Sequence, residues 1–139
     1  MCRWIDLKIQ HLITKYGTAE PFELACALNI TIVPSYSAKI FGLFTTYKRV
    51  KMIHIYDELS EEMKRFICAH ELGHAILQPE VNTPFMRENT LLSTEKIEVQ
   101  ANYFATKLLL NEQDFSKYQT KAQVLMACGI PSEMQRFLK

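Results

Sequence analysis

The chain has 139 residues, of which 48% are hydrophobic and 22% are charged, and its formal net charge is +1. This size predicts one domain over residues 1–139, with a C-terminal helical portion from about 111 to 139. The nearly neutral charge argues against nucleic acid as a direct partner, and no apolar run is long enough for a membrane span. Without a signal-like N-terminus or CxxC spacing, the chain is expected to be cytoplasmic, with its cysteines reduced.

The first two predicted elements are helices. Apolar residues at helical spacing predict a helix over residues 3–16, which Gly17 should end. A shorter helix should follow, with Pro21 in its first turn and Asn29 as a left-handed cap.

Three strands are expected next. The β-branched run at 30–33 should form a short strand that stops at Pro34. Residues 40–47 and 51–56 should form a hairpin around a tight turn near residues 48–49. We expect a small antiparallel three-stranded sheet beside a mainly helical remainder, which is an α+β fold. The exposed edge of this hairpin could hold an extended substrate as an added strand.

The next predicted helix, capped by Ser60, carries the pattern His-Glu-x-x-His. His70 and His74 are four residues apart, so both imidazoles lie on one face of the helix and can bind one metal ion. Glu71 points about 100° away from His70, where it can accept a proton from water as a general base. This division of roles is typical of a zinc hydrolase.

The alternative is that both histidines are hydrogen-bonded core residues, since they lie in the apolar stripe of the helix. Their spacing, the adjacent Glu71 and the small Gly73, which permits close helix packing, favour the metal site. Cys68 points about 200° away from His70 and is not expected to be a ligand.

A third ligand is expected from the predicted helix at 95–110. Glu98 lies at the edge of the apolar stripe beside Ala101, where a buried carboxylate needs a metal or an ionic partner. Glu95 is the competing candidate, although an acid in a first helical turn is also favoured by the helix dipole. Helical phase favours Glu98, and Asn102 one turn later can hydrogen-bond a ligating histidine.

The remaining segments are less informative. Residues 79–94 lack a clear period and are expected to form either a lid over the metal or an ordinary connection. Short helices are expected at 112–118, 121–128 and 131–138, the first capped by Asn111. The last two resemble a helix-turn-helix only faintly, and we interpret them as packing elements. Possible oxyanion-stabilising groups are Tyr47, His54, Arg87 and Tyr103, although His54 is more typical of an exposed strand histidine.

The segment around His70-Glu71-Leu72-Gly73-His74 resembles the signature helix of the ImmA/IrrE family of metallopeptidases. The run at 98–105, followed by the leucines at 108–110, resembles the second helix of that family. Further similarity at 22–25, 29–32 and 42–44 extends the resemblance over most of the chain. The chain departs from the family at Gln78, where a histidine is often found nearby, and at Asn111, where the family usually has Met-Pro.

The resemblance implies a zinc endopeptidase whose protein substrate is a helix-turn-helix repressor, encoded nearby on a phage or mobile element. Its cleavage would relieve repression. Two alternatives remain: a non-catalytic anti-repressor that sequesters the repressor by binding, and a regulatory protein with structural zinc. Neither needs the general base Glu71, and a closed structural site would need a fourth ligand that the sequence does not offer. The oligomeric state is not indicated by the sequence.

Overall fold

The computed structural model describes residues 2–86, 88–111 and 113–138. It confirms the α+β class. The elements, with η for 3₁₀ helices, are in chain order α1 (Arg3–Tyr16), α2 (Pro21–Ala27), β1 (Ile30–Ser35), β2 (Gly42–Tyr47), β3 (Val50–Tyr56), α3 (Glu61–Leu77), α4 (Glu88–Leu91), α5 (Lys96–Leu109), η1 (Phe115–Lys117), α6 (Lys121–Ala127) and η2 (Ser132–Phe137).

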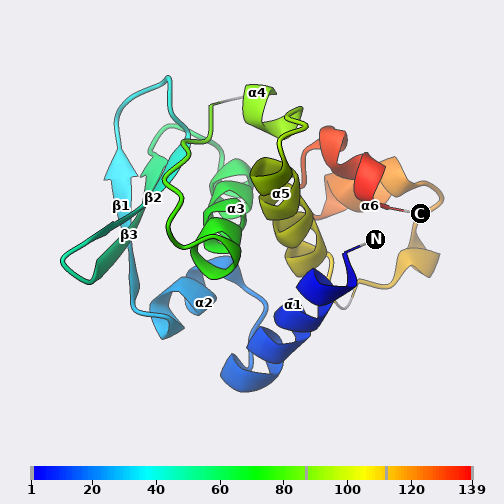
Figure 1. Cartoon of the computed structure of the whole chain (residues 1–139). Coiled ribbons are helices and arrows are strands. Elements are labelled where there is room, and N and C mark those ends of the chain that lie inside the picture. Colours follow the sequence, from blue (N-terminus) through cyan, green and yellow to red (C-terminus); the bar gives the residue numbers. More distant parts are fainter. Residues whose placement is uncertain (1, 87, 112, 139) are drawn as a thin grey trace.

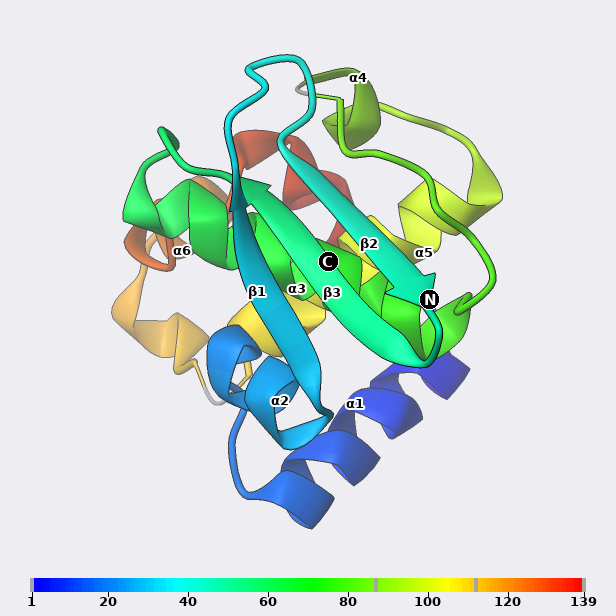
Figure 2. The ribbon, with the colours of Figure 1, turned by 90° about the vertical axis from the view of Figure 1, so that its left-hand side faces the viewer.

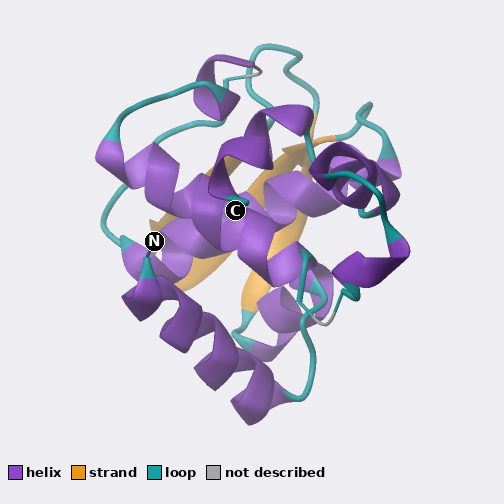
Figure 3. Ribbon diagram, turned by 90° about the vertical axis from the view of Figure 1, so that its right-hand side faces the viewer, coloured by secondary structure: helices purple, strands orange, loops and turns teal. Residues whose placement is uncertain are grey.

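The elements are arranged in layers around α3. The sheet lies on one side of α3, α5 lies on the other, and the C-terminal helices follow beyond α5 (Figure 1). The face of the sheet turned away from α3 carries no helix in the view of Figure 2. From the opposite side, helices stand in front of the sheet (Figure 3). Helix α3 is therefore central, and its residues 66–74 are buried.

The sheet is mixed, with strand order β1-β3-β2. Strands β2 and β3 form the expected antiparallel hairpin, and Lys48 and Arg49 at its turn have positive φ angles of 51° and 69°. Strand β1 pairs with β3 in parallel, so the prediction of a wholly antiparallel sheet is wrong. The strand pattern identified the strands, but it contains no signal for which edge of the hairpin β1 joins.

Strand β1 also runs past Pro34 to Ser35, two residues beyond its predicted end. Proline lacks a backbone N–H and is tolerated in a strand at the edge of a sheet. Because β1 has a neighbour only on its β3 side, Pro34 fits without loss of a ladder hydrogen bond.

In the first half of the chain, the helix ends in the structure agree with the predicted ones. Gly17 has φ 72° and its N–H donates to the carbonyl of Ile13, and Asn29 is left-handed with φ 59°. Ser60 caps α3 by accepting a hydrogen bond from the backbone N–H of Met63 at 3.1 Å. Gly17 and Asn29 therefore mark the ends of α1 and α2, and Ser60 marks where the central helix begins.

Helices α3 and α5 pack closely where Gly73 meets Ala101. A Cβ atom added at Gly73 would lie 3.2 Å from the Cα of Ala101 and 3.2 Å from the Phe104 ring. Hydrogen in place of a side chain therefore permits the close approach that the sequence indicated. This crossing brings the histidine face of α3 to the Glu98 turn of α5.

The connection between α3 and α5 has more structure than the sequence indicated. It contains the short helix α4, in which Thr90 and Leu91 are buried. Phe85 forms an antiparallel bridge with Gly42 of β2, so this segment is partly anchored to the sheet. Such a bridge depends on contacts distant in sequence, which a local pattern does not contain.

The C-terminal portion contains less regular α-helix than the sequence predicted. Only the 3₁₀ turn η1 forms in the range 112–118; its cap is Asp114 rather than Asn111, and Glu112 lies outside the described residues. The last predicted helix is the 3₁₀ segment η2. Helix α6 matches the prediction, and Met134 and Phe137 of η2 are buried, as expected for packing elements. Within the described residues, no helix is both long and apolar enough to cross a bilayer.

Candidate metal centre

His70 and His74 lie on consecutive turns of α3, on the face turned toward α5. Their side chains are 0% and 1% exposed, and their Nε2 atoms are 3.1 Å apart. The two rings are nearly perpendicular, with centroids 4.8 Å apart. Both nitrogens therefore point to one location between the helices.

Glu98 is the carboxylate that the structure brings to this location. Its Oε1 atom lies 3.1 Å from Nε2 of His70 and 2.9 Å from Nε2 of His74, and the residue is 4% exposed. Glu95 occupies the N-cap position of α5 without a side-chain capping bond and is exposed. Of the two acidic candidates, Glu98 is the one in contact with the histidines.

Asn102 determines which nitrogen of His70 carries the proton. Its side-chain amide donates to the backbone carbonyl of Thr90 at 3.0 Å, which leaves its Oδ1 atom facing Nδ1 of His70 at 2.8 Å. Since Oδ1 only accepts, Nδ1 of His70 donates. A neutral His70 therefore has its lone pair on Nε2, the atom that faces Glu98.

Gln78 has the same relation to His74. Its Oε1 atom accepts from Nδ1 of His74 at 2.8 Å, while its amide donates to Oε1 of Gln100 at 2.7 Å. The sequence prediction did not include these two glutamines. The signal was present, because Gln78 follows His74 by four residues and so can reach it along the helix.

Glu71 lies beside this cluster, but its carboxylate is farther from the histidines than that of Glu98. Its Oε2 atom is 4.0 Å from Nε2 of His70, and the residue is 0% exposed. None of the described residues makes a full hydrogen bond to either oxygen of Glu71. Burial, together with the nearby Glu98 charge, raises the pKa of Glu71 to about 8, although His74 and the backbone amide of Phe44 act in the opposite direction.

These atoms fit a bound metal ion. The ligand atoms of His70, Glu71 and His74 lie within 4.8 Å of one another, and Oε1 of Glu98 is closer to both histidines than Glu71 is. Burial opposes ionisation of Glu98, but its contacts with both histidines outweigh this and lower its pKa to about 2. Among the described residues, Oε2 of Glu98 also has no hydrogen-bond partner. Buried acceptors grouped in this way are stabilised by a cation or a proton, so the donor set fits a metal ion.

The centre is covered by residues 79–86, which we call the strap. The backbone N–H of Phe85 donates to the Gly42 carbonyl at 2.7 Å, and Phe41 N–H donates to the Phe85 carbonyl at 2.8 Å. With its amide nitrogen turned to the strand, Asn82 donates to the Phe44 carbonyl at 3.1 Å. The Phe85 ring is fully buried and packs edge-on to His70, with centroids 4.8 Å apart.

This arrangement corrects the expectation of an open hairpin edge for substrate. The edge of β2 does lie close to the centre, since a Cβ at Gly42 would be 3.3 Å from the Glu71 side chain. However, Phe85 already occupies this edge at Gly42. The strap therefore occupies the position that an added substrate strand would take.

The three candidate oxyanion groups that the structure describes do not converge on the centre. Tyr103 donates to Asp6 of α1 at 2.9 Å, and Tyr47 is 67% exposed at the hairpin turn. His54 bonds to Thr45 at 3.1 Å on the sheet face opposite the buried Ile53 and Ile55. Arg87 lies outside the described residues.

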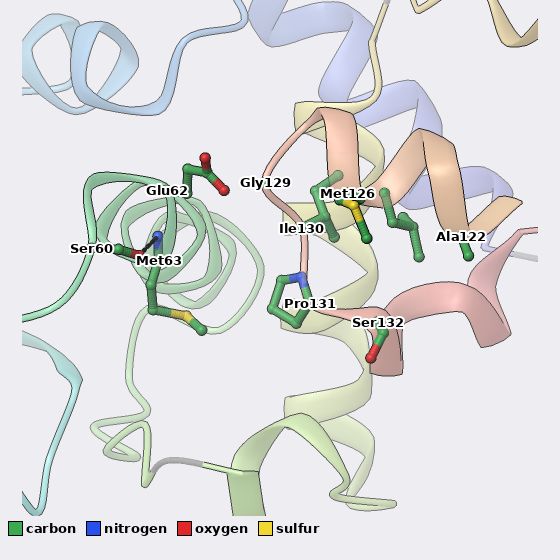
Figure 4. A pocket seen from close by; sticks show the side chains of 10 residues that line it. Ser60, Glu62, Met63, Ala122, Met126, Gly129, Ile130, Pro131 and Ser132 are labelled. Atoms are coloured by element: carbon green, nitrogen blue, oxygen red, sulfur yellow. Dashed lines mark hydrogen bonds between the residues drawn. The ribbon is translucent and has the colours of Figure 1, made fainter. Parts of the chain in front are cut away.

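A groove of about 340 Å³ lies elsewhere, between the start of α3 and the C-terminal helices. Figure 4 shows Ser60, Glu62 and Met63 on one side and Met126, Ile130 and Pro131 on the other. From Met63, His74 is about 16 Å away along the helix axis. This mainly apolar groove is therefore separate from the candidate centre.

Comparison with known proteins agrees with this geometry. Residues 26–127 match the model of the peptidase M78 family, described as the IrrE N-terminal-like domain. The chain is 42% identical over 135 residues to "Uncharacterized immunity region protein 2" of Bacillus phage phi105, covering 94% of this chain and 85% of that protein. It is 31% identical over 130 residues to "Metallopeptidase ImmA" of Bacillus subtilis (strain 168), covering 85% of this chain and 76% of the relative. The chain belongs to the ImmA/IrrE (M78) family and is a metallopeptidase.

Proposed function

We propose that the protein is a zinc-dependent endopeptidase in which His70, His74 and Glu98 hold the ion. The observation that carries this proposal is the convergence of two Nε2 atoms and one carboxylate oxygen within 3.1 Å, with both Nδ1 atoms tied up as donors. Two imidazoles and one carboxylate with a free fourth position are the ligand set of a catalytic zinc site.

Glu71 is assigned the role of general base. When bound, Zn²⁺ lowers the pKa of water and polarises the scissile carbonyl. Glu71 takes a proton from the attacking water and passes it to the leaving amine. Its pKa of about 8 without metal is near the working range of a base, and a nearby cation would favour its ionised form.

The proposed substrate is a helix-turn-helix transcriptional repressor whose cleavage relieves repression of a phage or mobile element. Two findings support this assignment: the family membership, and the phage relative that is named for an immunity region. Both support a protease that acts on a regulatory protein, not one that degrades proteins for nutrition.

The test is the substitution Glu71→Gln, which removes the base but leaves the three proposed ligands. A reporter is placed under the cognate repressor, and an immunoblot follows that repressor in the same cells. The variant should leave the repressor uncut and the reporter repressed, since loss of a general base costs about 10²- to 10⁴-fold in rate. Glu61→Gln is the matched control, because Glu61 lies on the same helix with its side chain 90% exposed.

Zinc content of the purified protein completes the test. One zinc per chain in wild type and in Glu71→Gln, with little in His70→Ala or His74→Ala, is the expected result. Full derepression by Glu71→Gln with intact repressor would contradict proteolysis and favour sequestration of the repressor. Full zinc in the double histidine variant would contradict the ligand assignment.

A further inference from the structure

Gln78 contacts His74 twice at the point where α3 ends. Its backbone N–H donates to the His74 carbonyl at 2.8 Å, and its side-chain Oε1 accepts from the imidazole Nδ1 at 2.8 Å. The backbone of Gln78 has left the helix, with φ −140° and ψ 65°. The helix terminus therefore places an acceptor behind the second histidine.

An amide can present either its oxygen or its nitrogen to a neighbour. If the Gln78 nitrogen faced His74, Nδ1 would have to accept, the imidazole proton would move to Nε2, and the lone pair aimed at Glu98 would be lost. Gln100 opposes this orientation, because its Oε1 accepts from the Gln78 nitrogen at 2.7 Å. Gln100 lies on α5 only two residues after Glu98, so this bond also links the two helices that carry the ligands.

The support of His70 is built differently. Asn102 is fully buried, and its orientation is fixed by the backbone carbonyl of Thr90. Gln78 and Gln100 are only partly buried, and each is held by a side chain. The orientation of His74 therefore depends on a pair of side chains that can be changed without opening the core.

We propose that Gln78 and Gln100 form a positioning pair that sets the metal affinity through the tautomer and orientation of His74. Gln78 acts on His74 directly, and Gln100 acts only through Gln78. This inference rests on the proposed function, because it assigns His74 as a ligand. It adds two residues of this chain that neither the ligand set nor the general base includes.

The experiment is a double-mutant cycle read out as zinc affinity, measured by competition with a chromophoric chelator. Gln78→Met removes the acceptor at similar length and should weaken zinc binding about 10- to 100-fold. Gln78→Glu keeps an acceptor for Nδ1 and should retain nearly wild-type affinity, because a carboxylate presents only acceptor oxygens to His74 and does not need Gln100 to fix its orientation. Gln100→Met should weaken binding less, and should add nothing in the Gln78→Met background.

Two measurements separate positioning from a structural role. Gln10→Met is the matched control, because Gln10 forms an amide contact with Asn111 at 3.4 Å, outside the candidate centre. Its zinc affinity should equal that of wild type. Unfolding of the metal-free proteins is also compared: a purely structural role would lower stability equally in Gln78→Met and Gln78→Glu, and would leave zinc affinity unchanged.

The outcomes are distinguishable from failure of the proposed function. If wild type binds zinc but Gln78→Met binds it equally well, the positioning pair is overturned and the ligand set stands. Additive effects of Gln78→Met and Gln100→Met would overturn the assignment that Gln100 acts through Gln78. If wild type binds no zinc, both the proposed function and this inference fail.

Discussion

Glu98 and Glu95 are separated by less than one helical turn, yet only Glu98 faces the histidines. Glu98→Ala should lose most of the bound metal, because it removes the carboxylate oxygen 2.9 Å from His74. Glu95→Ala should bind metal like wild type, because Glu95 is exposed at the start of α5. Metal content after dialysis against a weak chelator measures both. The reverse result would make Glu95 the third ligand.

The buried Glu71 should make the stability of the metal-free protein depend on pH. Its pKa rises from 4.5 to about 8 on folding, so between these values the folded state holds a proton that the unfolded state has released. Glu71 should therefore make the unfolding free energy fall by up to about 1.4 kcal/mol per pH unit. The net fall should be clearest from about pH 6.5 to 8, because burial lowers the pKa of His70 and this acts in the opposite sense below pH 6.5. Chemical denaturation at several pH values measures this slope.

Glu71→Gln is the control for that slope, because glutamine does not titrate. The variant should be flatter between about pH 6.5 and 8. Some fall should persist above pH 6.5, since bonding to Glu98 raises the pKa of His74 even though burial acts to lower it. At low pH, Glu98 acts in the opposite sense: its pKa of about 2 contributes stability that is lost as pH falls below 4.5. Equal slopes in both proteins would show that Glu71 is ionised in the fold.

For single residues, the sequence was informative wherever helical periodicity predicted the direction of a side chain. The i, i+4 spacing put His70 and His74 on one face, and helical phase preferred Glu98 over Glu95, as the structure has them. Gln78 and the strap residue Phe85 were missed. Gln78 was within reach of the same spacing rule, whereas the contact of Phe85 with His70 depends on how a loop folds back over the helix.

The strap is the element that we expect to control access to the centre. It is tied to the β2 edge by Phe85 and Asn82, and it leaves Glu71 closed to solvent. We expect this segment to move away from β2 when a substrate chain reaches Glu71. Asn82→Ala removes one tie from an exposed residue without opening the core. It should therefore speed both metal loss to a chelator and cleavage of the substrate.

Thr45→Ala is the matched control for the strap. It removes a hydrogen bond of similar length, to His54 at 3.1 Å, from the same strand but on the outer sheet face. Its metal-release rate should equal that of wild type. Phe85→Ala should speed release further, at a cost of about 3–5 kcal/mol in stability for a buried phenylalanine. Release from Asn82→Ala as slow as from wild type would show that the strap does not limit access.

Strand order shows why elements were easier to predict than their assembly. The β2–β3 hairpin was predicted from two strand patterns joined by a short segment, which is a local signal. The left-handed φ angles of Lys48 and Arg49 are seen only in the structure. The parallel pairing of β1 with β3 joins residues about twenty positions apart. The residue pattern of the hairpin is the same whichever of its two edges β1 joins. In the structure the outer edge of β2 is bridged by Phe85, and β1 occupies the remaining edge at β3.

For the whole molecule, the centre and the hydrophobic core are one interface. The proposed ligands on α3 and α5 belong to the same helix pair as the close Gly73–Ala101 contact, and Phe66, Leu72 and Phe104 of these helices are fully buried. Without metal, this interface contains carboxylate oxygens for which the described residues provide no hydrogen-bond donor. Buried acceptors of this kind destabilise a fold until a cation or proton compensates them.

Metal removal should therefore lower the stability of the whole chain rather than loosen the site alone. An ion that binds only the folded state stabilises it by about 4 kcal/mol when its free concentration is 1,000 times its Kd. Thermal unfolding with zinc or with chelator measures this difference. Glu71→Gln should keep the full shift because Glu71 is not a proposed ligand, whereas Glu98→Ala should show little. The same unfolding curve for wild type with and without chelator would mean that the α3–α5 interface does not depend on a bound ion.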